Sequence, residues 1–434
     1  MTINRRTFIK SSSAMAVGMA IPPLAAAKET VGRAAASDTV NVGLIGCGEM
    51  GTWDLTDLML HKEVRCLAMC DVNQPRLRER AGEITQIQGK QPDLYGDYRK
   101  ILDRKDIDAV VIGTPDHWHC LIFADACKAG KDIYVEKPIA NSIAECDAMV
   151  AAAQKYKRVV QVGQQQRSSR HFQEMIEYLR SGKLGKIGRV HVWCNFNYAA
   201  DPPPVPDSKA PEGLDYDMWL GPAPKVPFNE RRDEWRTHWH YGGGLMTDWG
   251  VHLLDMGLWG MDIKTMPLRV LSAGGNYLFP GGSHETYDTM SVTYQFPDFV
   301  MTWENNAGVQ TGPYGKNYGF LFRGVNGTLV ADREDWSVYP ETNKASEITV
   351  KADHQEHAAH TSNFLECIKT RNFNTACPIE NGSLCAKYAH LGNIGARLGG
   401  AALIYNDQTK KFDLDEAGKF LKPEYRSPWK FPEV

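Results

Sequence analysis

The sequence feature that most constrains the fold is a glycine pattern that directly follows a β-type run. Residues 39–45 lead into Gly46-Cys47-Gly48-Glu49-Met50-Gly51. A second apolar run, residues 64–70, ends in Asp71, which lies 71 − 51 = 20 residues beyond the third glycine. This spacing is typical of the βαβ unit that binds dinucleotides. The sequence therefore predicts a Rossmann-type domain in the first half of the chain.

Each residue of the pattern suits a pyrophosphate. Gly46 permits the tight turn, Gly48 lets backbone N–H groups approach the phosphates, and Gly51 lets the following helix pack closely with its positive end toward them. We expect Asp71 to accept hydrogen bonds from the adenosine ribose and to repel a 2′-phosphate. NAD is therefore favoured over NADP.

The alternation of strand and helix patterns continues through runs at 108–112, 133–135 and 159–163. Polar residues gather directly after two of these runs, in the segments 114–119 (Thr-Pro-Asp-His-Trp-His) and 136–138 (Glu-Lys-Pro). Ligands bind at the carboxyl edge of open parallel sheets. Both segments are therefore candidates for the site.

The second half of the chain has a different pattern, with short strand-like runs separated by turn residues. These runs are residues 189–193, 269–272, 290–296, 300–303 and 327–330. They predict a large, mostly antiparallel open sheet. The fold class is α/β, with a Rossmann domain at 38–163 and a C-terminal α/β domain for substrate binding and oligomerisation at 164–434.

Length and charge exclude several classes of protein. The 434 residues suffice for two or three domains, and 49 Lys and Arg against 52 Asp and Glu give a net charge of −3. A nucleic-acid partner is not expected, because the chain lacks a basic excess. Charged residues interrupt every apolar stretch after the first thirty residues, so no membrane span is expected. The ten cysteines form no C-x-x-C pair and are expected to be small buried groups.

The N-terminus has the pattern of an export signal. Arg5-Arg6 precedes a weakly apolar run and the small residues Ala25-Ala26-Ala27. This order resembles a twin-arginine signal, although Asn4 stands where Ser or Thr is usual. Residues 1–37 are thus predicted to be a signal peptide and short arm, and the protein to be periplasmic or secreted after folding in the cytoplasm.

Asp248 and His252 follow three consecutive glycines at a spacing of four residues. On a helix, this spacing places both side chains on one face. Alcohol oxidation needs a base for the hydroxyl proton, and imidazole titrates near neutral pH. The positive charge of Lys137 could stabilise a developing alkoxide. A His and an Asp on one helix face are, however, more often structural.

The chain resembles the Gfo/Idh/MocA family of oxidoreductases in four motifs that occur in the same order. They are residues 46–51, 114–119, 136–138 and the stretch Gly242-Gly243-Gly244-Leu245-Met246-Thr247-Asp248-Trp249-Gly250-Val251-His252. The resemblance implies a catalytic role for Lys137, Asp248 and His252. The predicted cofactor-binding residues are Gly46, Gly48, Glu49, Met50, Gly51, Asp71, Thr114, Pro115, His119, Glu136, Lys137 and Pro138.

Two further segments are candidates for the substrate side. Residues 198–229 contain eight prolines and could form either a lid over the sugar site or a surface arm used in assembly. Aromatic and polar groups alternate in residues 235–241, where Arg236, His238 and Tyr241 are candidate substrate contacts. The histidines in 354–360 suggest zinc but lack an obvious fourth ligand, so no metal is expected.

The resemblance implies hydride transfer between a sugar or polyol hydroxyl and a nicotinamide. Because free NAD is not replenished outside the cytoplasm, an exported enzyme must keep its cofactor tightly bound and restore its redox state. A second carbonyl compound could reoxidise it. Alternatively, transient oxidation, elimination and re-reduction would make the protein an NAD-dependent glycosidase, and a third reading is a non-catalytic sugar-binding protein. The resemblance also implies a homodimer or homotetramer.

Overall fold

The computed structural model describes residues 39–195, 203–342 and 344–434. The predicted signal peptide and arm at 1–37 lie outside the described residues, as does the start of the proline-rich segment. Among the described residues, no helix is long and apolar enough to cross a membrane. All ten cysteines are buried and free.

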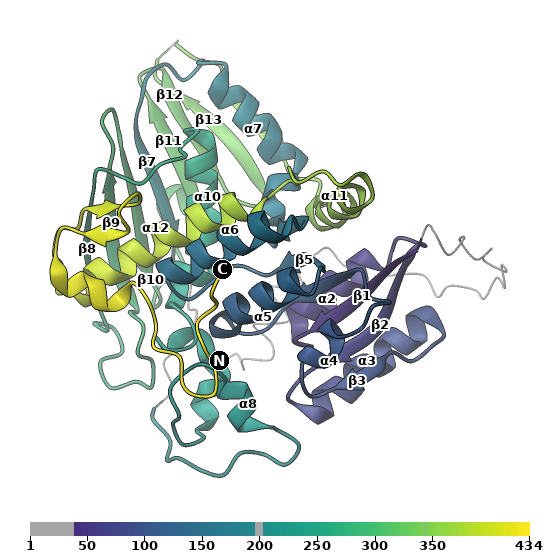
Figure 1. The fold of residues 1–434 in the computed structure, drawn as a ribbon. Coiled ribbons are helices and arrows are strands. Elements are labelled where there is room, and N and C mark those ends of the chain that lie inside the picture. Colours follow the sequence, from purple (N-terminus) through teal and green to yellow (C-terminus); the bar gives the residue numbers. More distant parts are fainter. Residues whose placement is uncertain (1–38, 196–202, 343) are drawn as a thin grey trace, which may run out of the picture. The chain divides into compact units, whose positions relative to one another are not determined.

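The first half forms a six-stranded parallel sheet in the order β3-β2-β1-β4-β5-β6 (Figure 1). The strand order reverses direction between β1 and β4, where dinucleotides bind in open α/β sheets. The strands are β1 (Val40–Ile45), β2 (Val64–Cys70), β3 (Asp93–Tyr95), β4 (Ala109–Ile112), β5 (Asp132–Val135) and β6 (Val160–Val162). The predicted Rossmann sheet is therefore present, with β3 as an additional strand that the sequence analysis did not single out.

Local sequence signals explain where the helices of this half begin and end. In α3, the Asn73 side chain accepts a hydrogen bond from the Arg76 N–H and Gly89 ends the helix with φ 74°. In α6, the Ser142 hydroxyl accepts from the Glu145 backbone N–H at 3.2 Å and donates to the Glu145 carboxylate at 2.9 Å, which caps the start of the helix. The helices are α2 (Glu49–Leu58), α3 (Gln74–Gln88), α4 (Arg99–Leu102), α5 (Asp116–Lys128) and α6 (Ile143–Tyr156).

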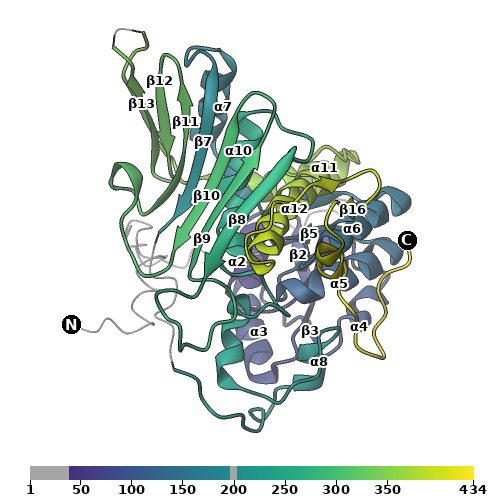
Figure 2. The same cartoon turned by 90° about the vertical axis from the view of Figure 1, so that its left-hand side faces the viewer.

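The second half contains an eight-stranded sheet in the order β14-β13-β12-β11-β7-β10-β9-β8 (Figure 2). All of its pairs are antiparallel except β10 with β7. The strands are β7 (Ile187–Cys194), β8 (Arg269–Gly275), β9 (Thr289–Gln295), β10 (Val300–Asn306), β11 (Tyr318–Gly324), β12 (Gly327–Ala331), β13 (Asp335–Pro340) and β14 (Ile348–Lys351). The predicted mostly antiparallel sheet is confirmed, and β11, β13 and β14 extend it.

Helices cover one face of this sheet, and buried and exposed residues alternate along β8 and β9. The alternation shows that the other face is open along β8 and β9, whereas β12 is buried on both faces. A small antiparallel pair, β15 (Tyr405–Asn406) and β16 (Lys411–Phe412), follows the last long helix. The helices of this half are α7 (Arg170–Arg180), α8 (Tyr216–Leu220), α9 (Gly244–Asp248), α10 (Gly250–Gly260), α11 (Glu356–Thr370) and α12 (Ile379–Arg397).

The stretch that carries Asp248 and His252 is divided rather than continuous. α9 ends at Asp248 and α10 begins at Gly250, with Trp249 between them in αR geometry (φ −89°, ψ −34°). Because Trp249 stays near helical angles, the two side chains remain about one turn apart. The spacing of four residues predicts both side chains on one helix face, and the structure keeps that relation across the junction.

Candidate functional site

The glycine loop after β1 is shaped for close approach of a ligand. Gly46 has φ 90°, and a Cβ there would lie 2.6 Å from the Thr114 backbone nitrogen. A Cβ on Gly51 would lie 2.4 Å from the Gly46 carbonyl oxygen, so only glycine lets α2 pack against the loop. By contrast, a Cβ on Gly48 would meet no atom of the described residues within 4 Å. The backbone at Gly48 therefore borders open space.

Polar groups lie beside the glycine loop. No side chain caps the N-terminus of α2 at Gly48. The Thr114 hydroxyl is buried without a hydrogen-bond partner among the described residues. Asp71 accepts hydrogen bonds from the backbone N–H groups of Cys47 and Asn73, each at 2.8 Å, which fixes its carboxylate beside the loop. Burial raises the pKa of Asp71. These groups fit a dinucleotide, with the pyrophosphate at the helix N-terminus and the ribose at Asp71.

The turn after β5 lies at the same edge of the sheet. Glu136 is buried and packs where a side chain on Gly163 would stand, and burial raises its pKa to about 7. His119 is buried too, with Nδ1 2.8 Å from the Pro138 carbonyl oxygen and Nε2 2.8 Å from that of Thr114. Burial lowers the pKa of His119 to about 4. His119, one of the predicted cofactor residues, therefore contacts the segments that follow β4 and β5 through both ring nitrogens.

Lys137 joins the Rossmann sheet to the α9–α10 junction. Its Nζ donates to Asp248 Oδ1 at 2.7 Å and to the Asp248 carbonyl oxygen at 3.3 Å. That carbonyl is accessible to Lys137 because the His252 N–H donates to Trp249 instead. Both partners are largely buried, with side-chain exposures of 10% and 12%. The structure thus brings together the three residues predicted to be catalytic.

His252 lies in surroundings that keep its imidazole neutral. The residue is 4% exposed, and its Nδ1 is buried without a hydrogen-bond partner among the described residues. Burial first, and then the charges of Lys137 and Arg333, lower the pKa of His252 well below 6.5. A neutral imidazole with a free ring nitrogen can accept a proton from a hydroxyl group.

The three candidate substrate residues have different surroundings. Arg236 Nε lies 3.2 Å from Asp248 Oδ1, and its guanidinium stacks on Trp235. His238 Nε2 lies 3.3 Å from the Arg231 carbonyl oxygen. Tyr241 is 2% exposed and packs in a separate apolar cluster. The contacts therefore place Arg236 at the candidate site, while His238 and Tyr241 pack against the neighbouring segments.

The structure adds residues that the sequence analysis did not assign. Asp116 is 3% exposed, and its Oδ1 has no hydrogen-bond partner in the described ranges. Burial raises its pKa well above the usual value despite the nearby charges of Arg236 and Lys137. Its position within the 114–119 motif was a signal that could have revealed it. Arg333 and Tyr318 approach Trp249 from the second sheet. No local sequence pattern connects these two residues with the site.

The described part of the proline-rich segment packs on the Rossmann domain. The Gln74 N–H donates to the Gly213 carbonyl oxygen at 2.9 Å, and the Asp215 N–H donates to that of Val72 at 3.0 Å. The segment thereby closes one side of a cavity of about 650 Å³ at the carboxyl ends of β2 and β3. The lining includes Val72, Gln74, Asp97, Arg99, Leu214 and Met218.

The histidine-rich segment around 354–360 has structural contacts. His357 stacks on Trp53 with ring centres 4.3 Å apart, and His360 Nε2 lies 2.8 Å from the Val162 carbonyl oxygen. Within the described part of the chain, no group of three or more His, Cys, Asp or Glu could hold a metal ion.

Comparison with known sequences identifies two matching domains. Residues 40–164 match the NAD-binding Rossmann fold of the Gfo/Idh/MocA oxidoreductase family, and residues 192–431 match the family's C-terminal alpha/beta domain. A "Glycosyl hydrolase family 109 protein" of Shewanella sp. strain W3-18-1 is 29% identical over 203 residues, which are 43% of this chain and 44% of that protein. An "Alpha-N-acetylgalactosaminidase" of Shewanella oneidensis is 27% identical over 256 residues, 55% of this chain and 51% of that protein. The chain spans about half the length of these curated relatives.

Solved structures share the fold at low sequence identity. A levoglucosan dehydrogenase in complex with NADH and levoglucosan aligns with a TM-score of 0.65 at 19% identity, covering 84% of this chain and 98% of that one. An aldose-aldose oxidoreductase from Caulobacter crescentus, complexed with glycerol, aligns with a TM-score of 0.64 at 19% identity. The alignment covers 84% of this chain and 99% of that one. With its NAD-binding Rossmann domain and C-terminal alpha/beta domain, this chain belongs to the Gfo/Idh/MocA oxidoreductase family.

Proposed function

We propose that this protein transfers hydride between a hydroxyl group of a sugar or polyol and a tightly bound NAD. One observation carries the proposal: Lys137, at the carboxyl edge of the Rossmann sheet, is paired at 2.7 Å with Asp248, one turn before the buried His252. This arrangement supplies a cation, a carboxylate and a neutral base for the proposed reaction.

Each side chain has a distinct role in the proposal. His252 accepts the hydroxyl proton at a ring nitrogen, because its depressed pKa keeps the imidazole neutral at physiological pH. The Lys137 ammonium stabilises negative charge on the substrate oxygen. Asp248 holds the ammonium in place through its carboxylate and its backbone carbonyl. A bound nicotinamide would supply the hydride acceptor for the carbinol carbon.

Two features support retention of the cofactor. The described part of the proline-rich segment is hydrogen-bonded to the loop after β2, beside Asp71. The export pattern at Arg5-Arg6 also favours a cofactor that travels with the folded protein. We include a periplasmic or secreted location and a homo-oligomer in the proposal, and cell fractionation and sedimentation test them.

A glycosidase is the second candidate, because the sequence relatives include proteins named as glycosyl hydrolase family 109 members and an alpha-N-acetylgalactosaminidase. The same three residues could remove a hydroxyl proton transiently before elimination and later return it. The net reaction would then be hydrolysis without a change in the cofactor. The two candidates therefore differ in their products rather than in their first step.

The experiment supplies the purified protein with free sugars, polyols and glycosides, and follows nicotinamide fluorescence together with product masses. Oxidoreduction predicts an oxidised sugar and stoichiometric reduction of the resident cofactor when no second carbonyl compound is present. Hydrolysis predicts released aglycone with the cofactor unchanged at the end. If no sugar, polyol or glycoside changes either readout, both candidates are wrong.

A further inference from the structure

An arginine from a turn of the second sheet lies close to the candidate base. Arg333 lies in the turn between β12 and β13, and its Cζ is 4.6 Å from the centre of the Trp249 ring. The Gln166 amide bridges Arg333 and His252 when it is oriented so that both its oxygen and its nitrogen are hydrogen-bonded. The Gln166 oxygen then accepts from Arg333 Nε at 3.0 Å, and the Gln166 nitrogen donates to the His252 carbonyl oxygen at 3.0 Å. The Arg333 guanidinium is therefore fixed close to His252 by an aromatic ring and a bridging amide.

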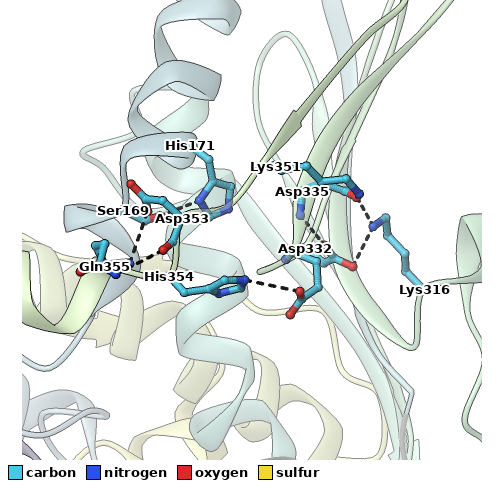
Figure 3. Close-up of polar contacts among 10 residues, drawn as sticks. Ser169, His171, Lys316, Asp332, Asp335, Lys351, Asp353, His354 and Gln355 are labelled. Carbon is cyan, nitrogen blue, oxygen red and sulfur yellow. Dashed lines mark hydrogen bonds and ion pairs between the residues drawn. The ribbon is translucent and has the colours of Figure 1, made fainter. Parts of the chain in front are cut away.

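The turn that presents Arg333 is braced by charged neighbours (Figure 3). Asp332 Oδ1 accepts from the backbone N–H groups of Glu334 and Asp335 at 2.9 and 3.0 Å. Lys316 donates to Asp332 Oδ2 at 2.8 Å and to Asp335 at 2.9 Å, and Lys351 reaches Asp335 from β14. A turn held by this many contacts presents its side chain in a defined position.

No carboxylate neutralises Arg333 within the described parts of the chain. The acidic residues on either side of it have other partners, since Asp332 pairs with Lys316 and Glu334 lies 3.6 Å from His354. Arg333 donates its Nε–H to Gln166, which leaves the other N–H groups of the guanidinium for a ligand. An unpaired guanidinium beside a reacting centre is suited to bind a carboxylate or sulfate through two parallel hydrogen bonds.

Other cations lie close to the same reacting groups. Lys137 Nζ is 2.7 Å and Arg236 Nε is 3.2 Å from Asp248 Oδ1. The charges of Lys137 and Arg333 both act on His252. The described residues therefore place Arg333 near His252 together with a second cation, Lys137.

We propose that the substrate is an acidic sugar, whose carboxylate or sulfate binds Arg333 while the hydroxyl to be oxidised lies at His252. The inference rests on the proposed function for the reaction but makes its own claim about binding. Arg333 is thus a specificity-determining residue, and neutral sugars of the same shape are expected to bind more weakly.

The test compares methyl glucuronide, glucose 6-sulfate and methyl glucoside by binding titration, followed through tryptophan fluorescence, and by nicotinamide reduction. The variants are Arg333→Leu and Arg333→Lys, with Arg323→Leu on β11 as the matched control because Arg323 is exposed. We expect the wild type to bind at least one anionic sugar about tenfold or more tightly than the glucoside. Arg333→Leu should lose that preference, Arg333→Lys should keep part of it, and Arg323→Leu should behave as the wild type. The anionic sugar that is preferred identifies carboxylate or sulfate as the group recognised.

The outcomes separate this inference from the proposed function. The role of Arg333 is overturned if the wild type binds neutral and anionic sugars equally, or if the preference survives in Arg333→Leu. It is also overturned if none of the three sugars binds. An anionic preference that depends on Arg333 but never leads to nicotinamide reduction supports the inference and counts against the proposed function. If Arg333→Leu does not fold, Arg333→Lys is compared with the wild type, because Lys keeps the charge but lacks the planar guanidinium group. A reduced preference for the anionic sugar in Arg333→Lys then supports the role of Arg333, and an unchanged preference overturns it.

Discussion

Asp248 and His252 lie one helical turn apart, yet they differ in how they meet the nearby cations. Asp248 forms ion pairs with Lys137 at 2.7 Å and with Arg236 at 3.2 Å. Among the described residues, the buried Nδ1 of His252 has no hydrogen-bond partner, and burial, followed by the charges of Lys137 and Arg333, lowers the pKa of His252. One short segment of chain thus presents an ion-paired carboxylate and a neutral imidazole to the same site.

This difference suggests a division of labour. A carboxylate held by two cations is a poor base, because protonation would break both ion pairs. A neutral imidazole without a partner can accept a proton with little rearrangement. We therefore assign positioning of Lys137 to Asp248 and proton transfer to His252, and the following predictions test this assignment from the largest expected effect on turnover to the smallest.

Replacing the base should have the largest effect. His252→Asn is expected to reduce turnover by roughly 10²- to 10⁴-fold, because an amide cannot accept the hydroxyl proton. The amount of NAD released on denaturation should stay the same, since the glycine loop is untouched. Steady-state rates and cofactor content measured on the same preparation check this, and unchanged turnover would remove His252 from the mechanism.

Removing the cation should have the next largest effect. Lys137→Met is expected to lower kcat by about 10²- to 10³-fold, because the charge on the substrate oxygen loses its stabilisation. The matched variant Arg236→Leu removes a second cation beside Asp248. The Arg236 side chain is 39% exposed and screened by solvent, so this variant should lose less than about tenfold in kcat. Equal losses in the two variants would contradict a special role for Lys137.

The pH dependence should reveal the neutral imidazole. Because burial and nearby cations depress the pKa of His252, kcat/KM for a neutral sugar should be flat through neutral pH and fall only as the pH drops well below 6.5. Arg333→Leu removes one of those cations, so the pKa of His252 rises and the acid limb moves to higher pH. A shift to lower pH, or none, would argue that another group titrates.

The smallest effect on turnover is expected three residues beyond His252. Asp255 is 1% exposed and makes a bidentate ion pair with Arg167 at 2.7 Å. Asp255→Asn should lower the free energy of unfolding by about 3 to 5 kcal/mol, because it leaves a buried guanidinium uncompensated. Turnover per folded molecule should change little. Denaturant unfolding together with active-site titration separates the two quantities, and a large loss of turnover in folded protein would extend the site along α10.

The features that were best predicted are those set by residues close together in the sequence. The strand, glycine turn and Asp71 lie within one short stretch, and their backbone requirements can be recognised there. The strand β11 was not recognised, although its Phe320 and Phe322 lie in the core of the second half. Its glycines at both ends obscure the strand pattern, and its position beside β7 is set by tertiary pairing.

The candidate site shows the same limit. The spacing of Asp248 and His252 could be recognised, but the preceding aromatic segment did not show that Arg236 approaches Asp248 while Tyr241 is buried elsewhere. Arg333 was missed entirely, because only the folding of β12 and β13 brings it to Trp249. The proline-rich segment left lid and assembly arm equally open, and the described contacts place part of it on the loop after β2.

The most direct test of the central claim is the transfer of an isotope label. A substrate sugar carrying deuterium on its carbinol carbons is mixed with the purified protein, and the nicotinamide released on denaturation is analysed by mass spectrometry. The account predicts one deuterium on the nicotinamide ring of the wild type and none within the same time in His252→Asn. A nicotinamide that is reduced without label, or that is labelled equally fast in His252→Asn, would contradict it.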